Sequence, residues 1–444
     1  MLNMTTFSSL PRPGWGLCLL ALLVTLTTPA AATTVQHWET DNGLQVYFVP
    51  SPALPMVDIR LVFNAGSARD GDHPGLARLT NTLLRDGAGD WDADTIAQRL
   101  EEVGAQLSTS SERDMAILNL RTLTEPDWLE TAVETLVTVV GQPTLTQRGL
   151  DRTRRQALVA LQAQQQNPGA IARRTFFETV YAGHPYAHPP LGTEAGLAGI
   201  TPAHLSTFHQ TYYVARNGIL ALVGGLDRDQ AEALAERIAA ALPEGEPAPA
   251  LPQVALPEAE QTIRVHFPSE QVHIFMGHPG MIRGDEDYFP LYVGNHRLGG
   301  GGFTSRLMDE VRTQRGLAYS VYSHFSPMAA AGPFLMGMQT QVTQADEAVA
   351  VMRQTLETFV ASGLDEDELK AAQANIVGGF PLRTASNSGI LDHVAMMGFY
   401  RLPLDYLDTF TDQVEALDPV TVNEAFARRV DPTRLVTVIV GGTD

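Results

Sequence analysis

A short pattern that occurs twice constrains the fold of this chain more than any other feature. Residues 218–227 and residues 434–444 are each an apolar, strand-like run that ends in Gly-Gly-x-Asp, and each follows an amphipathic segment. Near the start of each half, Val57-Asp-Ile and Val272-His-Ile form another matched pair. Matched segments that recur in one order at a nearly constant offset indicate duplication of a domain of roughly 200 residues.

Two further pairs of segments extend the repeat. Glu130-Thr-Ala-Val begins one helical pattern and Asp346-Glu-Ala-Val begins the other. In the same way, Gly149-Leu-Asp is matched by Gly363-Leu-Asp. We expect the two members of each pair to occupy equivalent places in their halves.

Each half combines helical patterns with strand patterns. Residues 95–103 carry apolar side chains at helical spacing, and residues 106–110 and 116–120 then alternate. A helix followed by two strand runs around a turn is typical of an antiparallel sheet with helices over it. The predicted fold class is therefore α+β, with two duplicated domains, each a mainly antiparallel sheet covered by helices.

The predicted boundary between the two halves is rich in proline. Residues 243–258 lack periodicity and carry enough proline to stay extended, which indicates a linker. We therefore predict an N-terminal domain at residues 33–242 and a C-terminal domain at residues 259–444.

The first 32 residues have the layout of a secretory signal peptide. Arg12 precedes an apolar run at residues 15–26, and Ala30-Ala-Ala provides a small-residue cleavage site. We predict that residues 1–32 are removed and that the mature protein is periplasmic or otherwise exported. An uncleaved membrane anchor is the alternative, but it would need a longer apolar run. No later segment has such a run, so we expect no stable membrane insertion.

The charge balance argues against one class of partner. The chain has 30 Lys and Arg against 50 Asp and Glu, which gives a formal net charge of −20 at pH 7. Nucleic-acid binding requires basic side chains clustered against phosphates, so we expect no nucleic-acid partner. Lys370 is the only lysine, and arginine supplies nearly all the positive charge.

A segment early in the first half has a counterpart in a known family. Gly66-Ser-Ala-Arg-Asp, followed by Gly75-Leu-Ala-Arg-Leu-Thr-Asn-Thr-Leu, resembles the segment that carries the inverted zinc motif His-x-x-Glu-His of the pitrilysin/insulinase family. In that motif two histidines on one helix face bind Zn²⁺, and the glutamate acts as general base on the bound water. The resemblance covers essentially the mature chain, and it implies that each chain forms half of a clam-shell chamber.

This resemblance places residues that cannot bind zinc at every ligand position. Arg78 and Thr82 stand where the motif has histidines, and Asn81 stands where it has glutamate. Ala160 is our assignment for the family's third ligand, in a stretch without glutamate. A guanidinium has no lone pair for a metal, and a Thr hydroxyl is a poor zinc ligand. We therefore expect no metal or other cofactor bound by this chain. The alternative is that this segment is a generic amphipathic helix.

Histidine pairs elsewhere do not offer a replacement for the motif. His184 and His188 have helical spacing, but the prolines around them argue against a helix, so we interpret this pair as structural. His204 and His209 are at positions i and i+5, which do not lie on one helix face.

The second half keeps a motif that the resemblance connects with catalysis. Residues 297–321 resemble the family's C-terminal domain, in which an Arg and a Tyr face the zinc site across the chamber. By position these are Arg312 and Tyr319. A Tyr hydroxyl can stabilise charge that develops on a carbonyl oxygen, and an Arg can orient the peptide. The structural alternatives are that Tyr319 packs in a core and that Arg312 pairs with Asp309 or Glu310.

A glycine run lies within the same segment. Gly299, Gly300, Gly301 and Gly302 precede Phe303, and such a run lets the backbone approach a ligand. As a phosphate loop it is weak, because no Gly-Lys-Ser/Thr follows. Related non-catalytic subunits carry glycine-rich loops that help to handle substrate. The resemblance therefore implies that these five residues bind peptide.

These features predict a non-catalytic subunit that pairs with a zinc-bearing homologous peptidase subunit. The partner would hold the zinc, and this chain would complete the partner's active site and bind peptide substrate. The alternative function is a non-enzymatic structural or peptide-binding member of the same family. Retention of Arg312 and Tyr319 favours the subunit.

Overall fold

Two mixed sheets organise residues 34–442, the part of the chain that the computed structural model describes. The first sheet contains β1 (Gln36–Glu39), β2 (Gln45–Pro50), β3 (Met56–Phe63), β6 (Gln106–Ser111), β7 (Ala116–Leu123) and β8 (Gly218–Gly224). The second contains β9 (Gln261–Val265), β10 (Gln271–Met281), β11 (Ala318–Phe325), β12 (Gly332–Gln341) and β13 (Val436–Val440). A small ribbon pairs β4 (Gly87–Ala88) with β5 (Trp91–Asp92).

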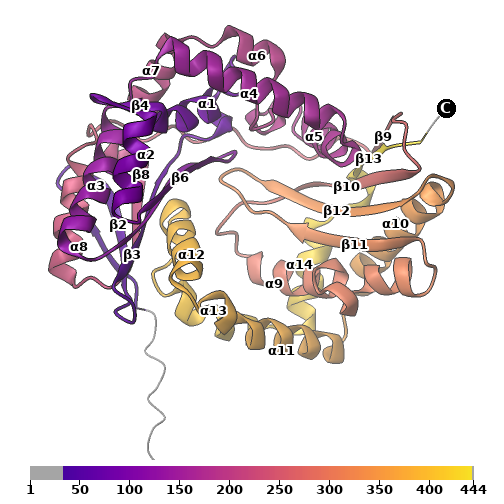
Figure 1. Cartoon of the computed structure of the whole chain (residues 1–444). Coiled ribbons are helices and arrows are strands. Elements are labelled where there is room, and N and C mark those ends of the chain that lie inside the picture. Colours follow the sequence, from indigo (N-terminus) through magenta and orange to yellow (C-terminus); the bar gives the residue numbers. More distant parts are fainter. Residues whose placement is uncertain (1–33, 443–444) are drawn as a thin grey trace, which may run out of the picture. The chain divides into compact units, whose positions relative to one another are not determined.

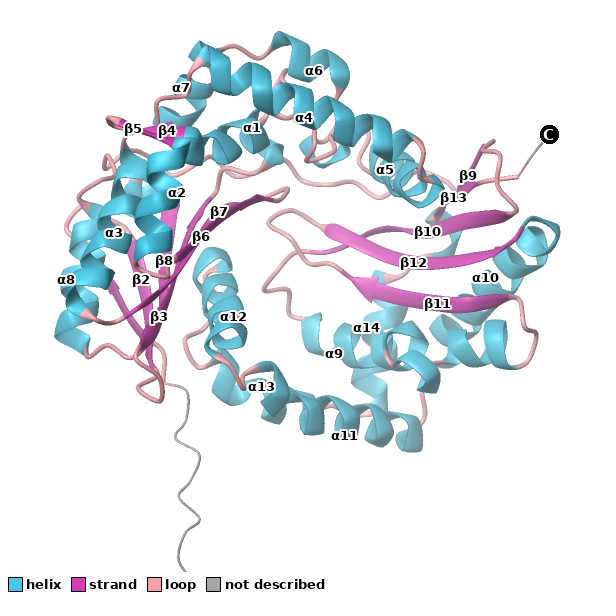
Figure 2. Cartoon of the chain, viewed as in Figure 1, coloured by secondary structure: helices cyan, strands magenta, loops and turns pink. Residues whose placement is uncertain are grey.

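Helices pack over both sheets (Figures 1 and 2). The first half contains α1 (Leu76–Leu83), α2 (Ala93–Glu102), α3 (Pro126–Gly141), α4 (Gln147–Gln165), α5 (Pro168–Val180), α6 (Glu194–Gly199), α7 (Pro202–Tyr212) and α8 (Arg228–Ala239). The second contains α9 (Tyr288–Asn295), α10 (Ala345–Ser362), α11 (Glu366–Arg383), α12 (Asn387–Tyr400), α13 (Tyr406–Glu415) and α14 (Pro419–Arg429). The predicted α+β class is confirmed. None of the helices in residues 34–442 is long and apolar enough to cross a membrane.

The two sheets have the same strand order. The first runs β1-β2-β8-β3-β7-β6, and the second, read from its far edge, runs β9-β13-β10-β12-β11. β2 pairs with β8 in parallel, as β9 does with β13, and the other neighbours are antiparallel. Each strand of the second sheet therefore has a counterpart in the first, and β1 is an addition.

The matched glycines of the repeat occupy equivalent places. A Cβ atom on Gly224 would lie 2.4 Å from the carbonyl oxygen of Met56, and one on Gly441 would lie 2.5 Å from that of Gln271. Met56 and Gln271 precede the matched Val-Asp-Ile and Val-His-Ile segments. Both halves therefore need glycine at the end of their last core strand, where β8 separates from β3 and β13 separates from β10. Any side chain at these two positions would collide with the backbone of the neighbouring strand.

One pair in the predicted repeat is not equivalent. Gly149 lies inside α4, which begins after its N-cap Thr146. Gly363 instead ends α10 with a left-handed φ of 68°, and Asp365 then caps α11. The two Gly-Leu-Asp segments are therefore out of register, because α4 and α11 are equivalent helices with differently placed caps.

Each sheet is also covered by a helix from the other half of the chain. In Figure 1, α12 lies beside the first sheet and α5 beside the second; α12 contacts β2, β3 and β8, and α5 contacts β10 and β13. Arg60 of β3 forms an ion pair with Asp392 of α12 at 2.7 Å. On the other side, a Cβ on Gly169 of α5 would lie 3.0 Å from Nδ1 of His273 in β10. The halves thus exchange one helix each and pack as one unit, Val35–Asp444.

Buried Asp114 joins the two halves at the turn between β6 and β7. It accepts hydrogen bonds from the hydroxyl of Tyr186 at 2.5 Å, the hydroxyl of Tyr400 at 3.1 Å and the backbone nitrogen of Ala329 at 2.9 Å. Tyr400 ends α12, and Ala329 belongs to the β11–β12 connection. One carboxylate therefore ties three segments together that are distant in sequence.

The predicted linker at residues 243–258 contains no helix or strand, and it packs against the unit. Oδ1 of Asn217 accepts a hydrogen bond from Ala248 N at 2.8 Å, and Nε2 of His184 lies 3.1 Å from Pro252 O. Leu251 and Val254 pack against buried aromatic side chains. His184 thus has the structural role predicted for it, next to a short turn at Pro185–Ala187 rather than in a helix.

Candidate functional site

The glycine loop lies between α9 and β11. It consists of a π-helical turn at His296–Gly300 and a short 3-10 turn at Gly302–Thr304, and a second π-helical stretch, Met308–Thr313, follows it. A Cβ on Gly299 would lie 2.4 Å from Oγ of Ser323 in β11, so only glycine allows the loop to lie on this strand. Gly302 has a left-handed φ of 59° with open space around it. The loop is therefore anchored at Gly299 and open at Gly302.

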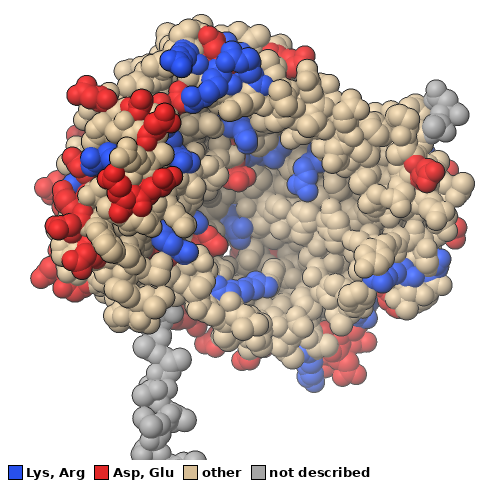
Figure 3. Space-filling view, in the orientation of Figure 1, with Lys and Arg blue, Asp and Glu red and all other residues tan. Residues whose placement is uncertain are grey.

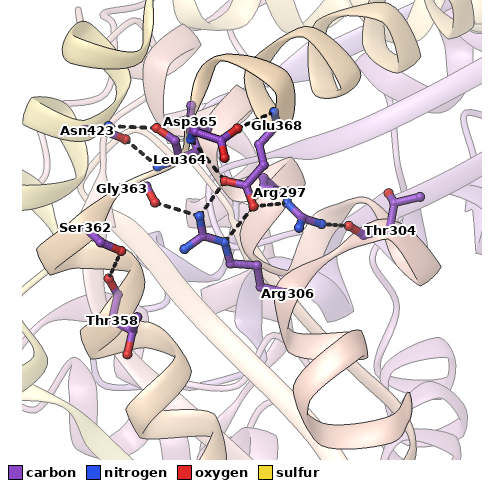
Figure 4. Close-up of polar contacts among 10 residues, drawn as sticks. All are labelled: Arg297, Thr304, Arg306, Thr358, Ser362, Gly363, Leu364, Asp365, Glu368 and Asn423. Atoms are coloured by element: carbon purple, nitrogen blue, oxygen red, sulfur yellow. Dashed lines mark hydrogen bonds and ion pairs between the residues drawn. The ribbon is translucent and has the colours of Figure 1, made fainter. Parts of the chain in front are cut away.

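Glu368 of α11 holds both ends of this loop (Figure 4). Its carboxylate accepts hydrogen bonds from Nε of Arg297 at 2.9 Å and from Nε of Arg306 at 3.1 Å. Arg306 also donates to the carbonyl of Gly363 at 2.7 Å, and Arg297 donates to the carbonyl of Thr304. Burial opposes ionisation, but the hydrogen bonds from Arg306 and Arg297 outweigh it and lower the pKa of Glu368 to about 2. Glu368 is therefore charged at neutral pH and closes the base of the loop.

Three of the predicted site residues lie together at the surface. The guanidinium carbon of Arg312 is 4.8 Å from the ring centre of Phe303 and 4.7 Å from that of Tyr319. Phe303 is 75% exposed and Tyr319 is 82% exposed. Cation–π contacts of this kind position the guanidinium without neutralising its charge. We call Phe303, Arg312 and Tyr319 the aromatic–arginine stack.

The structure contains neither a core position for Tyr319 nor an ion pair of Arg312 with Asp309 or Glu310, the two structural alternatives. Tyr319 does not pack in a core, because its side chain is exposed. Asp309 accepts a hydrogen bond from Gln314, and Glu310 pairs with Arg315 at 2.5 Å. Among residues 34–442, Arg312 has no carboxylate partner, so its charge is available to a ligand.

An irregularity in β11 directs Tyr319 outward. Ala318 pairs with Thr340 of β12, but the register has shifted where Val321 pairs with Met338. A bulge of this kind re-aims a side chain at a sheet edge. Tyr319 consequently borders a shallow hollow of about 420 Å³ at the edge of the second sheet, also lined by Gln271, Gln339 and Gln341.

The helix that resembles the zinc motif presents no metal site. Arg78 and Thr82 lie on the exposed side of α1, whereas Asn81 is 1% exposed. Nδ2 of Asn81 donates to the carbonyl oxygen of Ser110 at 2.5 Å and to that of Ile117 at 3.4 Å. The position of the missing general base therefore holds α1 to β6 and β7.

α1 contains no His, Cys, Asp or Glu, and the one such residue of its neighbour α4, Asp151, forms an ion pair with Arg154 at 3.0 Å. Ala160 of α4 is partly buried against the hydrophobic core of the first half, and its side chain has no atom that can bind a metal. Within residues 34–442, no three His, Cys, Asp or Glu side chains are grouped so that they could hold a metal ion. His204 stacks on His73 at 4.3 Å, and Nε2 of His209 lies 2.8 Å from Val140 O. The residues present do not fit a zinc ion.

The sequence did not indicate which residues hold the loop. Glu368 belongs to a capping box with Asp365 at the start of α11, and that pattern was readable from Asp-x-x-Glu. Its contacts with Arg297 and Arg306 were not readable, because they span 71 and 62 residues.

Comparison with known proteins identifies the family. Residues 46–194 match the description Insulinase (Peptidase family M16), and residues 199–376 match Peptidase M16 inactive domain. A crystal structure of a peptidase M16 inactive domain from Pseudomonas fluorescens is 39% identical, with a TM-score of 0.89 over 93% of this chain and 98% of that one.

Two curated relatives are similar over most of the chain. The non-peptidase homolog YmxG of Helicobacter pylori is 27% identical over 428 residues, which cover 95% of this chain and 98% of the relative. An uncharacterized zinc protease of Streptomyces coelicolor is 25% identical over 371 residues, which cover 81% of this chain and 80% of the relative. With its two similar halves and non-ligating residues at the zinc-motif positions, the chain belongs to peptidase family M16, the insulinase family, as an inactive member related to zinc proteases.

Proposed function

We propose that this chain is the non-catalytic subunit of an exported heteromeric zinc metallopeptidase. A zinc-bearing homologue would hold the metal and the general base. Each chain would form half of a closed chamber, and this chain would present the aromatic–arginine stack to the partner's site. The mature protein would act in the periplasm or otherwise outside the cytoplasm, after removal of residues 1–32.

The observation that carries the proposal is the environment of Arg312, which has aromatic neighbours but no carboxylate partner among residues 34–442. An arginine kept partly exposed between two aromatic rings, without a carboxylate partner among residues 34–442, contributes little to folding. Its fixed charge is suited to a peptide carbonyl or to negative charge that develops during hydrolysis. The same chain has Arg78 and Thr82 at the motif's ligand positions and Asn81 at the position of the general base. A site with a retained Arg and Tyr and no metal position is suited to completing a site in another chain.

Each residue of the site then has a role toward the peptide. The hydroxyl of Tyr319 would donate a hydrogen bond to the oxygen that becomes negative when water attacks the carbonyl. Arg312 would hold a neighbouring carbonyl and so orient the peptide. The open part of the glycine loop, Gly300–Phe303, would contact the peptide backbone, and Gly299 would keep the loop on β11.

Reconstitution tests the proposal. The mature chain is mixed with a zinc-bearing homologue from the same genome, and hydrolysis of a quenched fluorescent peptide library is measured for each chain and for the mixture. We expect a stable complex and hydrolysis that requires both chains. Arg312→Ala should assemble normally but lower both affinity and turnover, whereas Arg315→Ala, which removes a neighbouring paired arginine, should not. Full activity of the homologue alone, unchanged by this chain, would contradict the proposal and leave the structural or peptide-binding alternative.

A further inference from the structure

Arg113 and Arg173 are two further arginines that contact aromatic rings, and they are separate from the aromatic–arginine stack. Arg113 lies in the β6–β7 turn, where its guanidinium carbon is 3.6 Å from the ring centre of Phe177 and its Nε donates to Tyr186 O at 3.1 Å. Arg173 projects from α5, with its guanidinium carbon 5.7 Å from the ring centre of Phe275. Burial is the main cause that lowers the pKa of Arg113 to about 10, and the nearby charge of Arg173 acts in the same direction. Arg173 and Phe177 are one turn apart on α5, so Arg173 lies on the same helix face as the ring that carries the Arg113 guanidinium.

Carboxylates flank Arg113 in the chain at Glu112 and Asp114, but neither is an ion-pair partner of this pair. Within residues 34–442, neither arginine forms an ion pair, although Arg174, the next residue of α5, lies 3.7 Å from Glu178. The residues three and four places from Arg173 on its own helix are Gly169, Ala170, Phe176 and Phe177, so its helix face carries no acid. Glu112 influences the pKa of Arg113 less than Arg173 does. Two uncompensated guanidinium groups on aromatic rings form a surface that an anion would stabilise.

Arg173 lies near the strand that also carries Tyr319. A Cβ on Gly337 of β12 would lie 2.6 Å from the ring of Tyr322 in β11 and 3.0 Å from the ring of Phe275, the ring that Arg173 contacts. The charge of Arg173 acts on Tyr322 and His324 of β11: it opposes burial, which raises the pKa of Tyr322, and it adds to burial, which lowers the pKa of His324. Tyr322 and His324 stack at 5.8 Å. Since an extended strand rises about 3.3 Å per residue, Tyr322 and His324 lie roughly 10–16 Å along β11 from Tyr319. An extended peptide covers that length with about three to five residues.

The hollowed face of the unit is consistent with such a site. Figure 3 shows several Lys or Arg side chains within the hollow, with some Asp or Glu side chains beside them, whereas most acidic side chains in this view lie on the outer surface at the left. The chain as a whole is strongly acidic. The hollow therefore carries basic side chains that can attract negatively charged groups of a ligand.

We propose that Arg113 and Arg173 form a carboxylate-binding subsite that selects peptides with an acidic group about three to five residues from the segment at Tyr319. The inference rests on the proposed function only in taking a peptide as the ligand. The carboxylate can come from a Glu or Asp side chain or from a free C-terminus. Two guanidinium groups can hold either one in a bidentate manner.

Peptide binding to the mature chain alone tests this subsite, so a failure to reconstitute hydrolysis would leave the result intact. The probes are fluorescein-labelled decapeptides of Gly, Ser and Ala with two central Glu or two central Gln, each with a free or an amidated C-terminus. Fluorescence anisotropy gives the dissociation constants at 50 and 300 mM NaCl. We expect the Glu peptide, or the peptide with a free C-terminus, to bind at least about tenfold more tightly than the amidated Gln peptide. The preference should weaken at high salt.

Variants of Arg173, the exposed member of the pair, test whether the two arginines bind the carboxylate. Arg173→Gln should abolish the preference, and Arg173→Glu should reverse it toward a matched Lys peptide, whereas Arg155→Gln, an exposed arginine of α4, should leave it unchanged. Arg113→Gln should act in the same direction, provided that its melting temperature matches the wild type; if it unfolds, the two Arg173 variants still decide. Equal binding of all peptides, or wild-type preference in Arg173→Glu, would overturn the proposal. Loss of assembly with the zinc-bearing homologue, with unchanged peptide binding, would overturn it too and place the arginines in the subunit interface.

Discussion

The guanidinium carbon of Arg312 lies 4.7 Å from the ring centre of Tyr319, and this contact is the one that holds the tyrosine ring in place at the surface. Tyr319 is otherwise exposed, and its hydroxyl has no hydrogen-bond partner among residues 34–442. The ring is therefore oriented by a cation, and the hydroxyl is left for a ligand.

The first prediction concerns this hydroxyl in the reconstituted complex. Tyr319→Phe keeps the ring against Arg312 and removes one donor. We expect turnover to fall on the order of 100-fold, as is typical when an oxyanion donor is lost. KM should change much less, because the bond strengthens only as the transition state forms. Steady-state kinetics of the mixed complex measure both quantities.

The matched control for this variant is Tyr212→Phe, which changes a partly exposed tyrosine of α7 far from the site in sequence. It should leave kcat and KM unchanged. A Tyr319→Phe complex with wild-type turnover and normal assembly would remove the catalytic role of Tyr319.

The second prediction concerns the position of the lost general base. In Asn81→Glu, a carboxylate replaces the amide that donates to the carbonyl oxygens of Ser110 and Ile117. A buried charge beside two acceptors should lower the free energy of unfolding by roughly 2–4 kcal/mol. Chemical denaturation measures the loss, and Thr82→His on the exposed side of α1 should be nearly neutral.

The triple variant Arg78→His, Asn81→Glu, Thr82→His should bind no stoichiometric zinc in metal analysis, because Ala160 still provides no third ligand.

The third prediction concerns the pH dependence of the loop anchor. The pKa of Glu368 falls from an ordinary value of 4.5 to about 2 in the folded chain. A depressed carboxyl pKa stabilises the folded state above about pH 4.5, and this contribution is lost as the pH falls toward 2. Because both arginines are partly exposed, we expect Glu368→Gln to cost roughly 1–2 kcal/mol at pH 7.

Thermal unfolding of wild type and Glu368→Gln between pH 7 and pH 3 checks this sign. The difference in melting temperature should shrink as the pH falls. Hydrogen exchange in residues 296–306 should be faster in the variant at pH 7, since the loop loses its charged anchor. A difference that grows on acidification would contradict the assigned direction of the pKa shift.

The fourth prediction uses the glycines of the repeat. Gly224→Ala forces a methyl group against Met56 O and should destabilise the chain by roughly 2–3 kcal/mol. Gly378, inside α11, has no atom within 4 Å of its ideal Cβ position. Gly378→Ala should therefore stabilise the chain by about 0.5–1 kcal/mol. Denaturant unfolding of both variants measures the contrast, and equal effects would show that the close approach at Gly224 is unimportant.

The sequence by itself determined the duplication, the α+β class and the residue types at the zinc-motif positions. These are local properties: the Gly-Gly-x-Asp runs and the residues at 78, 81 and 82 can be read in short windows. Periodicity and residue chemistry act over a few residues, so they remain visible without coordinates. The pairing of Gly149 with Gly363 was wrong because helix caps shift by several residues without disturbing the apolar pattern.

Only the tertiary structure decided which residues meet. The exchange of α5 and α12 between the halves, the ion pairs of Glu368 with Arg297 and Arg306, and the contact of Arg113 with Phe177 of α5 all join segments far apart in the chain. The aromatic–arginine stack spans few residues, yet it forms only because the bulge in β11 directs Tyr319 outward. Such contacts depend on how sheets and helices pack in three dimensions, and side-chain spacing along the chain does not contain that information.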